Sequence, residues 1–191
     1  MLLPFCGLFR SIKTGVVLIQ AIGKCLKSTD LSTQKAALLS GISLFKSFRV
    51  CQQSKLQSKK VDTKTVPQFA ELQVEMMTKE ILGAVTGRLR ANRSGGDDVT
   101  ALTVQAISQF PVHLALWDSV NWPSLEKSVQ CVISVLSGQP LLPLEVHMPL
   151  CGFLVRTFQN TTTNSHDATQ ERLRLSILDV FSFSLELRFN V

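Results

Sequence analysis

Apolar residues recur at steps of three and four along the first 50 residues, which is the spacing of one face of an α-helix. Between residues 5 and 26 these positions hold Phe, Leu, Ile and Val, while basic and amide side chains fall on the opposite side. Asp30 to Thr33 offer side-chain oxygens that can cap a second helix. The predicted buried stripe of this second helix consists of Leu38, Leu39, Ile42, Phe45 and Phe48. We therefore expect a basic helix pair over residues 1–53, joined as an αα-hairpin.

The stretch from residue 51 to residue 66, CQQSKLQSKKVDTKTV, loses the apolar periodicity and gains lysines. Two interpretations fit this pattern: a frayed extension of the second helix, or an exposed loop. We take residues 54–66 as a polar, lysine-rich linker and as the best candidate for an internal boundary. The remaining helices are then expected in residues 67–191, and the whole chain forms a single helical-repeat region.

Helical periodicity returns after this stretch, and prolines, glycines and capping residues divide it into further segments. Pro149 is expected either to kink its helix or to divide it into two short ones. Predicted helices run from Pro67 to about Arg90, from Asp97 or Asp98 to Phe110, from Val112 to Trp117, from Asn121 to Leu136, from Leu144 to Phe158 and from Ala168 to Val180.

The last segment follows a different rule. Apolar residues at 181, 183, 185, 187 and 189 alternate with polar ones, which is the period of a β-strand. The sequence offers no second strand, and a single strand would leave its backbone groups without partners. We expect either a helix that persists against the pattern or a tail whose partner lies outside this chain.

Composition supports a folded, leucine-rich helical protein. The 191 residues are 45% hydrophobic and 18% charged, and the mean hydropathy is +0.21, which excludes intrinsic disorder. The net charge of +6 is uneven, because residues 1–64 hold 11 basic against 2 acidic residues and residues 65–191 hold 9 against 12. The basic first third predicts attraction to nucleic acid, anionic lipid or an acidic protein surface, or simply a solvated face.

The candidate basic interaction patch follows from this asymmetry. Its residues are Lys46, Arg49, Lys55, Lys59, Lys60 and Lys64. If the second helix extended through this stretch, Lys55 and Lys59 would share one face of it, and Lys60 and Lys64 would share another. The patch has no interleaved aromatics, so nucleic-acid binding through it is expected to be weak, independent of base sequence and sensitive to salt.

The chain offers little catalytic or metal-binding chemistry. Its five cysteines have no C-x-x-C spacing, its three histidines lie in unrelated contexts, and no phosphate-binding or nucleophile motif is present. We expect no enzyme activity, no cofactor and no metal, with reduced cysteines inside the cell, in the cytoplasm or nucleus. No apolar run is long enough to cross a membrane. Contact of residues 5–27 with a membrane surface remains an alternative.

Successive amphipathic helix pairs, helix-opening or mid-helix prolines and apolar chain ends resemble the armadillo and HEAT-type α-solenoids. The prolines concerned are Pro67, Pro111, Pro143 and Pro149. The chain also resembles the meiosis inhibitor family of large helical-repeat proteins, which is linked to meiotic double-strand-break formation. The resemblance implies stacked helical hairpins, either as a piece of a longer array or as a closed domain whose ends fold inward.

Two functions follow as expectations. The first is a non-enzymatic scaffold that binds other proteins. The second is a nuclear or chromosomal helical-repeat protein that contacts nucleic acid through its basic N-terminal third.

Overall fold

The computed structural model describes residues 12–57, 67–91, 98–112, 122–138, 142–161 and 168–189, and every regular element in these ranges is a helix. In chain order the helices are α2 (Ile12–Leu26), α3 (Leu31–Gln57), α4 (Pro67–Met76), the π-helix η1 (Met77–Leu82), α5 (Gly83–Ala91), α6 (Asp98–Gln109), α8 (Trp122–Leu136), α9 (Leu144–Thr161) and α10 (Ala168–Phe189). The all-helical prediction is therefore confirmed for these residues. Residues 1–11 and nearly all of the short helix predicted at 112–117 lie outside the described residues.

The turn between α2 and α3 is organised by Asp30. Its Oδ2 accepts hydrogen bonds from the hydroxyls of Ser32, at 2.6 Å, and Thr33, at 2.5 Å, and from the backbone N–H of Thr33 at 2.8 Å. These donors, led by the Ser32 hydroxyl, hold the pKa of Asp30 far below its ordinary value because each stabilises the ionised carboxylate. The cap predicted from sequence is thus present at the start of α3.

Helix α3 continues to Gln57, so the helical interpretation is correct for residues 51–57. The boundary proposed between residues 53 and 54 falls inside this helix rather than at its end. Residues 58–66 lie outside the described part of the chain.

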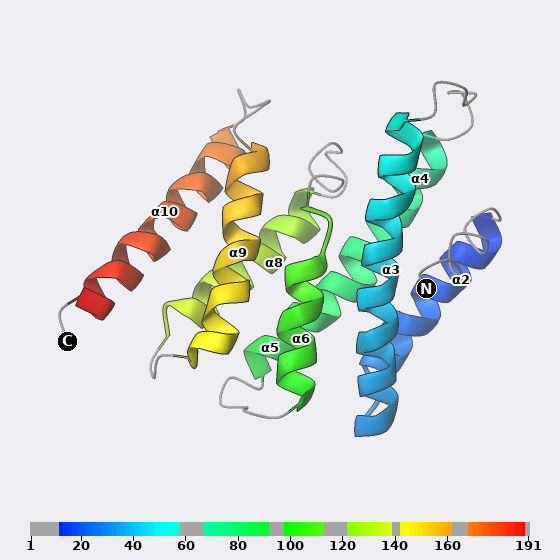
Figure 1. Ribbon diagram of the computed structural model, residues 1–191, viewed down its shortest axis with the longest axis horizontal. Coiled ribbons are helices and arrows are strands. Elements are labelled where there is room, and N and C mark those ends of the chain that lie inside the picture. Colours follow the sequence, from blue (N-terminus) through cyan, green and yellow to red (C-terminus); the bar gives the residue numbers. More distant parts are fainter. Residues whose placement is uncertain are drawn as a thin grey trace.

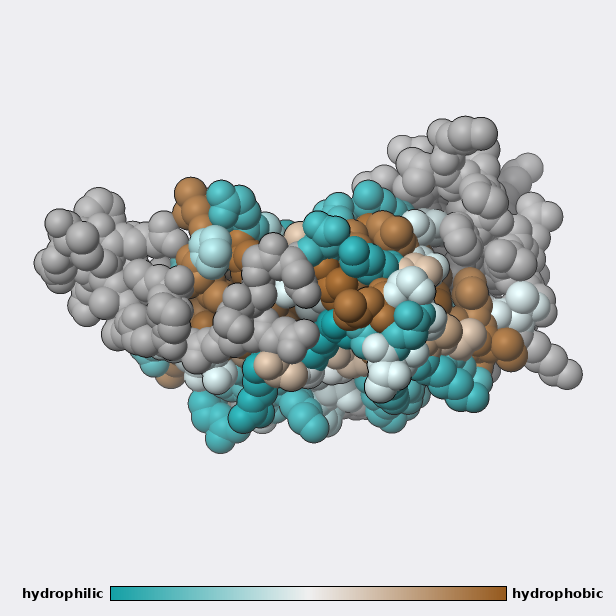
Figure 2. Space-filling view, turned by 90° about the horizontal axis from the view of Figure 1, so that it is seen from below, coloured by the Kyte–Doolittle hydropathy of each residue, from teal (hydrophilic) through white to brown (hydrophobic). Residues whose placement is uncertain are grey.

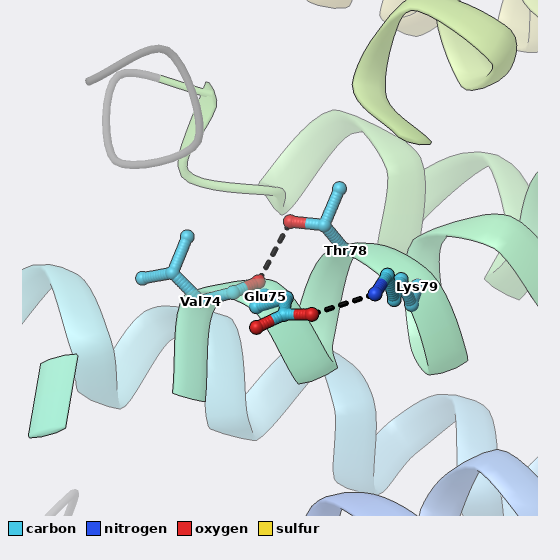
Figure 3. Close-up of polar contacts among 4 residues, drawn as sticks. All are labelled: Val74, Glu75, Thr78 and Lys79. Atoms are coloured by element: carbon cyan, nitrogen blue, oxygen red, sulfur yellow. Dashed lines mark hydrogen bonds and ion pairs between the residues drawn. The ribbon is translucent and has the colours of Figure 1, made fainter. Parts of the chain in front are cut away.

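The segment predicted as one helix after Pro67 contains a π-helix that the sequence pattern did not reveal. The backbone N–H of Gly83 bonds the carbonyl of Thr78, five residues back, instead of the residue four back. The Thr78 hydroxyl donates to the carbonyl of Val74 at 2.7 Å, and Lys79 Nζ lies 2.6 Å from Glu75 Oε1, the predicted i,i+4 pair (Figure 3). The buried residues of the π-helix are Met77, Thr78, Ile81 and Leu82.

Two further expectations are resolved by α9 and α10. Helix α9 is not divided at Pro149. The proline has no N–H for the carbonyl of Glu145, but Glu145 is exposed, so water can replace that donor. Helix α10 persists to Phe189 despite the alternating pattern, because a helix satisfies its own backbone while the described residues contain no strand for pairing.

The helices form two layers (Figure 1). Layer B contains α3, α6 and α9, with α6 packed against both of the others. Layer A contains α2, the α4–η1–α5 segment, α8 and α10, each packed against the next. Contacts of α2 with α3, α5 with α6, α8 with α9, and α9 with α10 join the layers. Each helix of layer B therefore follows a neighbour from layer A along the chain.

One apolar core lies between the layers and spans the described part of the molecule. The predicted stripes supply it: Leu38 and Ile42 of α3, Leu125 and Val129 of α8, and Ile177 of α10 are all buried. Leu39, also predicted to be buried, is 52% exposed instead. Phe45 of α3 meets Phe110 edge to face, with ring centroids 5.2 Å apart and an interplanar angle of 89°.

Candidate protein-interaction face

The predicted basic patch is only partly within the described residues. Lys46, Arg49 and Lys55 all belong to α3, and the Lys46 side chain is exposed. Lys59, Lys60 and Lys64 lie outside the described residues. Positions 46 and 55 are nine residues apart, or two and a half turns of an α-helix, so they fall on opposite sides of α3. The helical backbone thus separates these two positions instead of grouping them.

The apolar stripe proposed for membrane contact is already used in packing. In α2, Ile19, Ile22 and Leu26 are buried in the core, while Gln20 and Lys24 face solvent as expected. Membrane binding by this stripe would require α2 to leave α3 and η1. Phe5, Leu8 and Phe9, which extend the predicted stripe, lie outside the described residues. Among the described helices, none is both long enough and apolar enough to span a bilayer.

No metal-binding arrangement occurs in the part of the chain that the structure describes: it contains no group of three or more His, Cys, Asp or Glu side chains suited to a metal ion. Cys25, Cys131 and Cys151 are not in disulfide bonds. His147 is buried on α9, whereas His113 and His166 lie outside the described residues.

The outer surface of layer B brings together side chains that are far apart in the sequence. We call this surface the layer B face. It is formed by Ala36, Leu39, Ser40, Ser43 and Lys46 of α3, Ala101, Gln105 and Ser108 of α6, and Leu144, Met148, Cys151, Gly152, Val155 and Gln159 of α9. Each helix contributes positions three or four residues apart, the spacing of its solvent-facing side.

Exposed aliphatic side chains mark the two flanks of this face. Leu39 is 52% exposed on α3, and Met148 and Val155 are 60% and 39% exposed on α9. Between them α6 presents Ala101 and Gln105. Uncharged side chains on the middle helix, between larger aliphatic ones on its neighbours, make a surface suited to a largely uncharged partner.

Polar contacts at its two ends hold the face together. Lys35 Nζ of α3 lies 3.1 Å from Asp98 Oδ2 at the start of α6. Arg156 of α9 donates from Nη2 to the carbonyl of Ser108 near the end of α6. Lys35 and Asp98 neutralise each other, whereas Arg156 keeps its charge at the edge of the face. Lys46 is the one charged residue among those that form the face, and exposed Glu145 of α9 borders it.

Layer A presents a different surface. Its exposed side carries many charges, among them Lys24, Lys79, Arg90, Lys127 and Asp179. Lys27 and Glu80 pair at 3.1 Å across α2 and η1, and Arg172 and Glu126 lie 3.4 Å apart across α10 and α8. Figure 2 shows hydrophobic and hydrophilic residues side by side in the upper half of the view, while hydrophilic ones form most of its lower edge. Among the described side chains, exposed charges are thus more numerous on layer A than on the layer B face, where Lys46 is the one charged member.

Sequence reasoning did not find the layer B face: it placed Leu39 in the buried stripe of its helix and named no exposed or buried side for residues 144–158. A partial signal existed on α9, where Leu144, Met148 and Val155 repeat at steps of four and seven and fall on the side opposite Leu150 and Phe153. No such signal links α9 to α3, because their contact with α6 is a tertiary property.

Comparison with known proteins adds no relative: no protein family, no curated protein and no solved structure matches this chain.

Proposed function

We propose that this chain is a non-enzymatic helical scaffold of the armadillo or HEAT type, which binds another protein through the layer B face. Two layers of helices that alternate along the chain support the α-solenoid interpretation. In such a fold the helices of one layer form a continuous surface that a partner can cover.

The nearly uncharged, aliphatic character of the layer B face carries the proposal. Surface residues away from binding sites are usually rich in charge, as layer A is, and a neutral apolar surface loses little by leaving water. The Leu39, Met148 and Val155 side chains would supply the buried centre of the interface, with Lys46 and Gln159 at its rim.

A matched pair of variants tests this function. The face variant replaces Leu39, Met148 and Val155 by Glu. The control variant replaces three layer A residues of similar exposure, Val17 (62%), Leu175 (53%) and Leu178 (45%), by Glu. All six side chains are already in contact with solvent, so both variants should fold, which circular dichroism verifies.

Tagged wild-type chain and both variants are purified from cells, and co-purifying proteins are quantified by mass spectrometry. A specific partner is expected to drop about tenfold or more with the face variant, because charges buried at an interface are costly, and to remain with the control variant. Equal loss from both variants, or loss from the control alone, would contradict binding through layer B.

A second candidate is a nuclear or chromosomal helical-repeat protein of the meiosis inhibitor kind that contacts nucleic acid. The observation that favours it is that positions 46 and 49 are three residues apart on α3 and so share one side of the helix, whereas Lys55 is on the opposite side from Lys46. Phosphate contacts by such residues release counterions, so binding should weaken steeply with salt.

Charge reversal separates this second candidate from the first. Changing Lys46, Arg49 and Lys55 to Glu should abolish binding to a mixed-sequence duplex and its salt dependence. Changing Lys24, Arg90 and Lys127 in layer A makes the same change in net charge and should leave most of the binding. Equal effects of the two triple variants would indicate attraction to net charge alone and would reject a site on α3.

A further inference from the structure

The layer B face contains a cysteine in contact with a histidine. Cys151 Sγ lies 3.4 Å from Nδ1 of His147, one turn earlier on α9. His147 is 4% exposed, whereas Cys151 is half-buried beside the exposed Met148. The imidazole therefore lies beneath the surface, whereas the cysteine in contact with it is partly exposed.

This geometry places a base next to a nucleophile. The thiolate is the reactive form of cysteine, and an imidazole within hydrogen-bonding distance can take the thiol proton. Burial disfavours an isolated charge, but proton transfer here creates two opposite charges side by side, and each stabilises the other. The adjacent Gly152 has no side chain, and Arg156 Nη1 lies 3.6 Å from the position that its Cβ would take.

Cys131 on α8 provides an internal comparison. It is also half-buried, but its Sγ donates to the carbonyl of Thr86 at 3.1 Å. A carbonyl cannot take the proton, and burial raises the pKa of the Cys131 thiol, with a smaller opposing effect from Arg90. Two thiols of similar exposure thus have opposite partners: a base for Cys151 and a pure acceptor for Cys131.

We propose that Cys151, with His147 as its base, is a covalent modification site that forms a mixed disulfide with a low-molecular-weight disulfide of the glutathione class. His147 takes the thiol proton, and the Cys151 sulfur attacks one sulfur of the small disulfide. The disulfide bond breaks, a new S–S bond joins Cys151 to half of the reagent, and the other half leaves as a thiolate that recovers the proton. Cys151 is oxidised and the released half is reduced, so no other reactant is needed.

The consequence for binding rests on the proposed function, because Cys151 lies on the layer B face. A tripeptide-sized adduct there would cover the surface between Met148 and Val155 and block the protein partner. The chemistry itself is tested on the isolated chain, so a failure of the modification site and a failure of the scaffold function give different results.

The first experiment measures alkylation rates of the intact, folded chain at neutral pH. The chain is treated with iodoacetamide for increasing times and quenched, and each cysteine is quantified by mass spectrometry. Trypsin alone leaves Cys131 and Cys151 in one peptide, residues 128–156, so a second protease that cuts after Glu145 separates them. Cys151 is expected to react about tenfold faster than Cys131, since reactivity follows the thiolate fraction.

His147→Gln tests the role of the base. The variant should slow Cys151 severalfold and leave Cys131 unchanged, which a merely structural role of His147 would not produce. If the substitution unfolds the chain, the alkylation of Cys131 also becomes faster. The ratio of the Cys151 and Cys131 alkylation rates in the wild-type chain then tests the proposal. The proposal is overturned if Cys151 reacts no faster than Cys131 in the wild-type chain. It is also overturned if Cys151 reacts at an unchanged rate in a folded His147→Gln chain.

The second experiment incubates the chain with oxidised glutathione and maps the adduct. The mixed disulfide is expected on Cys151, and Cys151→Ser should remove it while Cys131→Ser should not. An adduct distributed equally over Cys25, Cys131 and Cys151 overturns the proposal.

Discussion

Layers A and B bury similar aliphatic stripes but differ in what they present to solvent. In layer A the outer positions of α8 hold Lys127 and Gln130, whereas those of α9 in layer B hold Met148 and Val155. The core alone requires only the inward stripe, which both layers supply. The residues that face outward can therefore differ between the two layers. The layer B face, which has few charges, is the better candidate for binding a protein.

The layers also differ in regularity. Layer A contains the π-helix η1, packed against α2 so closely that a Cβ on Gly23 would lie 3.0 Å from Glu80 Cβ. Layer B has no π-helix in its described residues, and an aromatic pair joins α3 to the end of α6. Large aromatic side chains thus join α3 to the end of α6 in layer B. In layer A, α2 can approach η1 closely because Gly23 has no side chain.

The largest effect is expected in layer B, at Phe45. Its ring is 1% exposed and packs on Phe110, so Phe45→Ala would leave a cavity and lower the free energy of unfolding by about 3–5 kcal/mol. Urea denaturation followed by circular dichroism measures it. A loss below about 1 kcal/mol would show that α3 and α6 do not depend on this pair.

The next effect tests the close approach in layer A. Gly23→Ala should destabilise the chain by about 1–3 kcal/mol, because the new methyl group meets Glu80. Gly87→Ala is the matched control on α5, where no atom lies within 4 Å of the added Cβ. It should stabilise the helix by up to about 1 kcal/mol. Equal, stabilising effects of both substitutions would contradict the packing of α2 on η1.

A smaller effect is expected at the turn where layer A passes into layer B. Asp30→Ala removes the acceptor for Ser32 and Thr33 and should lower the melting temperature at neutral pH. Because the folded-state pKa of Asp30 is lowered, its contribution is complete above the unfolded value near 3.8 and falls as pH drops towards the folded value. The difference from wild type should therefore shrink in acid. A constant difference from neutral to acidic pH would show that the carboxylate charge has no role in the cap.

The smallest effect is expected at the end of the layer B face. Lys35 and Asp98 form an ion pair whose side chains are 42% and 86% exposed. Lys35→Ala should change the free energy of unfolding by only a few tenths of a kcal/mol, and less in high salt. Chemical denaturation at low and high salt measures this change. A loss above about 1 kcal/mol would mean that this contact, rather than apolar packing, holds α3 to α6.

Much of the local structure could be predicted from sequence. The Asp30 cap, Pro123 in the first turn of α8 and the Glu75–Lys79 pair all depend on residues within one or two turns. The π-helix was missed because its apolar residues fit an α-helical stripe almost as well. The hydrogen bond from Gly83 to Thr78 shows where the π-helix lies. Gly23 of α2 allows the close packing of α2 against it at Glu80.

Most of the candidate sites could not be predicted. The basic patch was defined by its charge and by the spacing of its two lysine pairs, 55/59 and 60/64, and of these four lysines only Lys55 lies within the described residues. The layer B face requires that Leu39, Ala101 and Val155 lie on the same side of three packed helices. The Cys151–His147 contact suggests a reactive thiol only because the structure shows His147 buried and Cys151 partly exposed.

The sequence by itself determined that this protein is helical, where most of its helices begin and end, and which stripe of most helices is apolar. These properties depend on hydrogen bonds and side-chain contacts within a few residues. Only the tertiary structure decided which aliphatic residues remained exposed after the core was filled, and that the exposed sides of α3, α6 and α9 form one face with a single charged member, Lys46. Packing determines which residues stay exposed, because a helix buries one side against its neighbours and leaves the other side to solvent or to a partner.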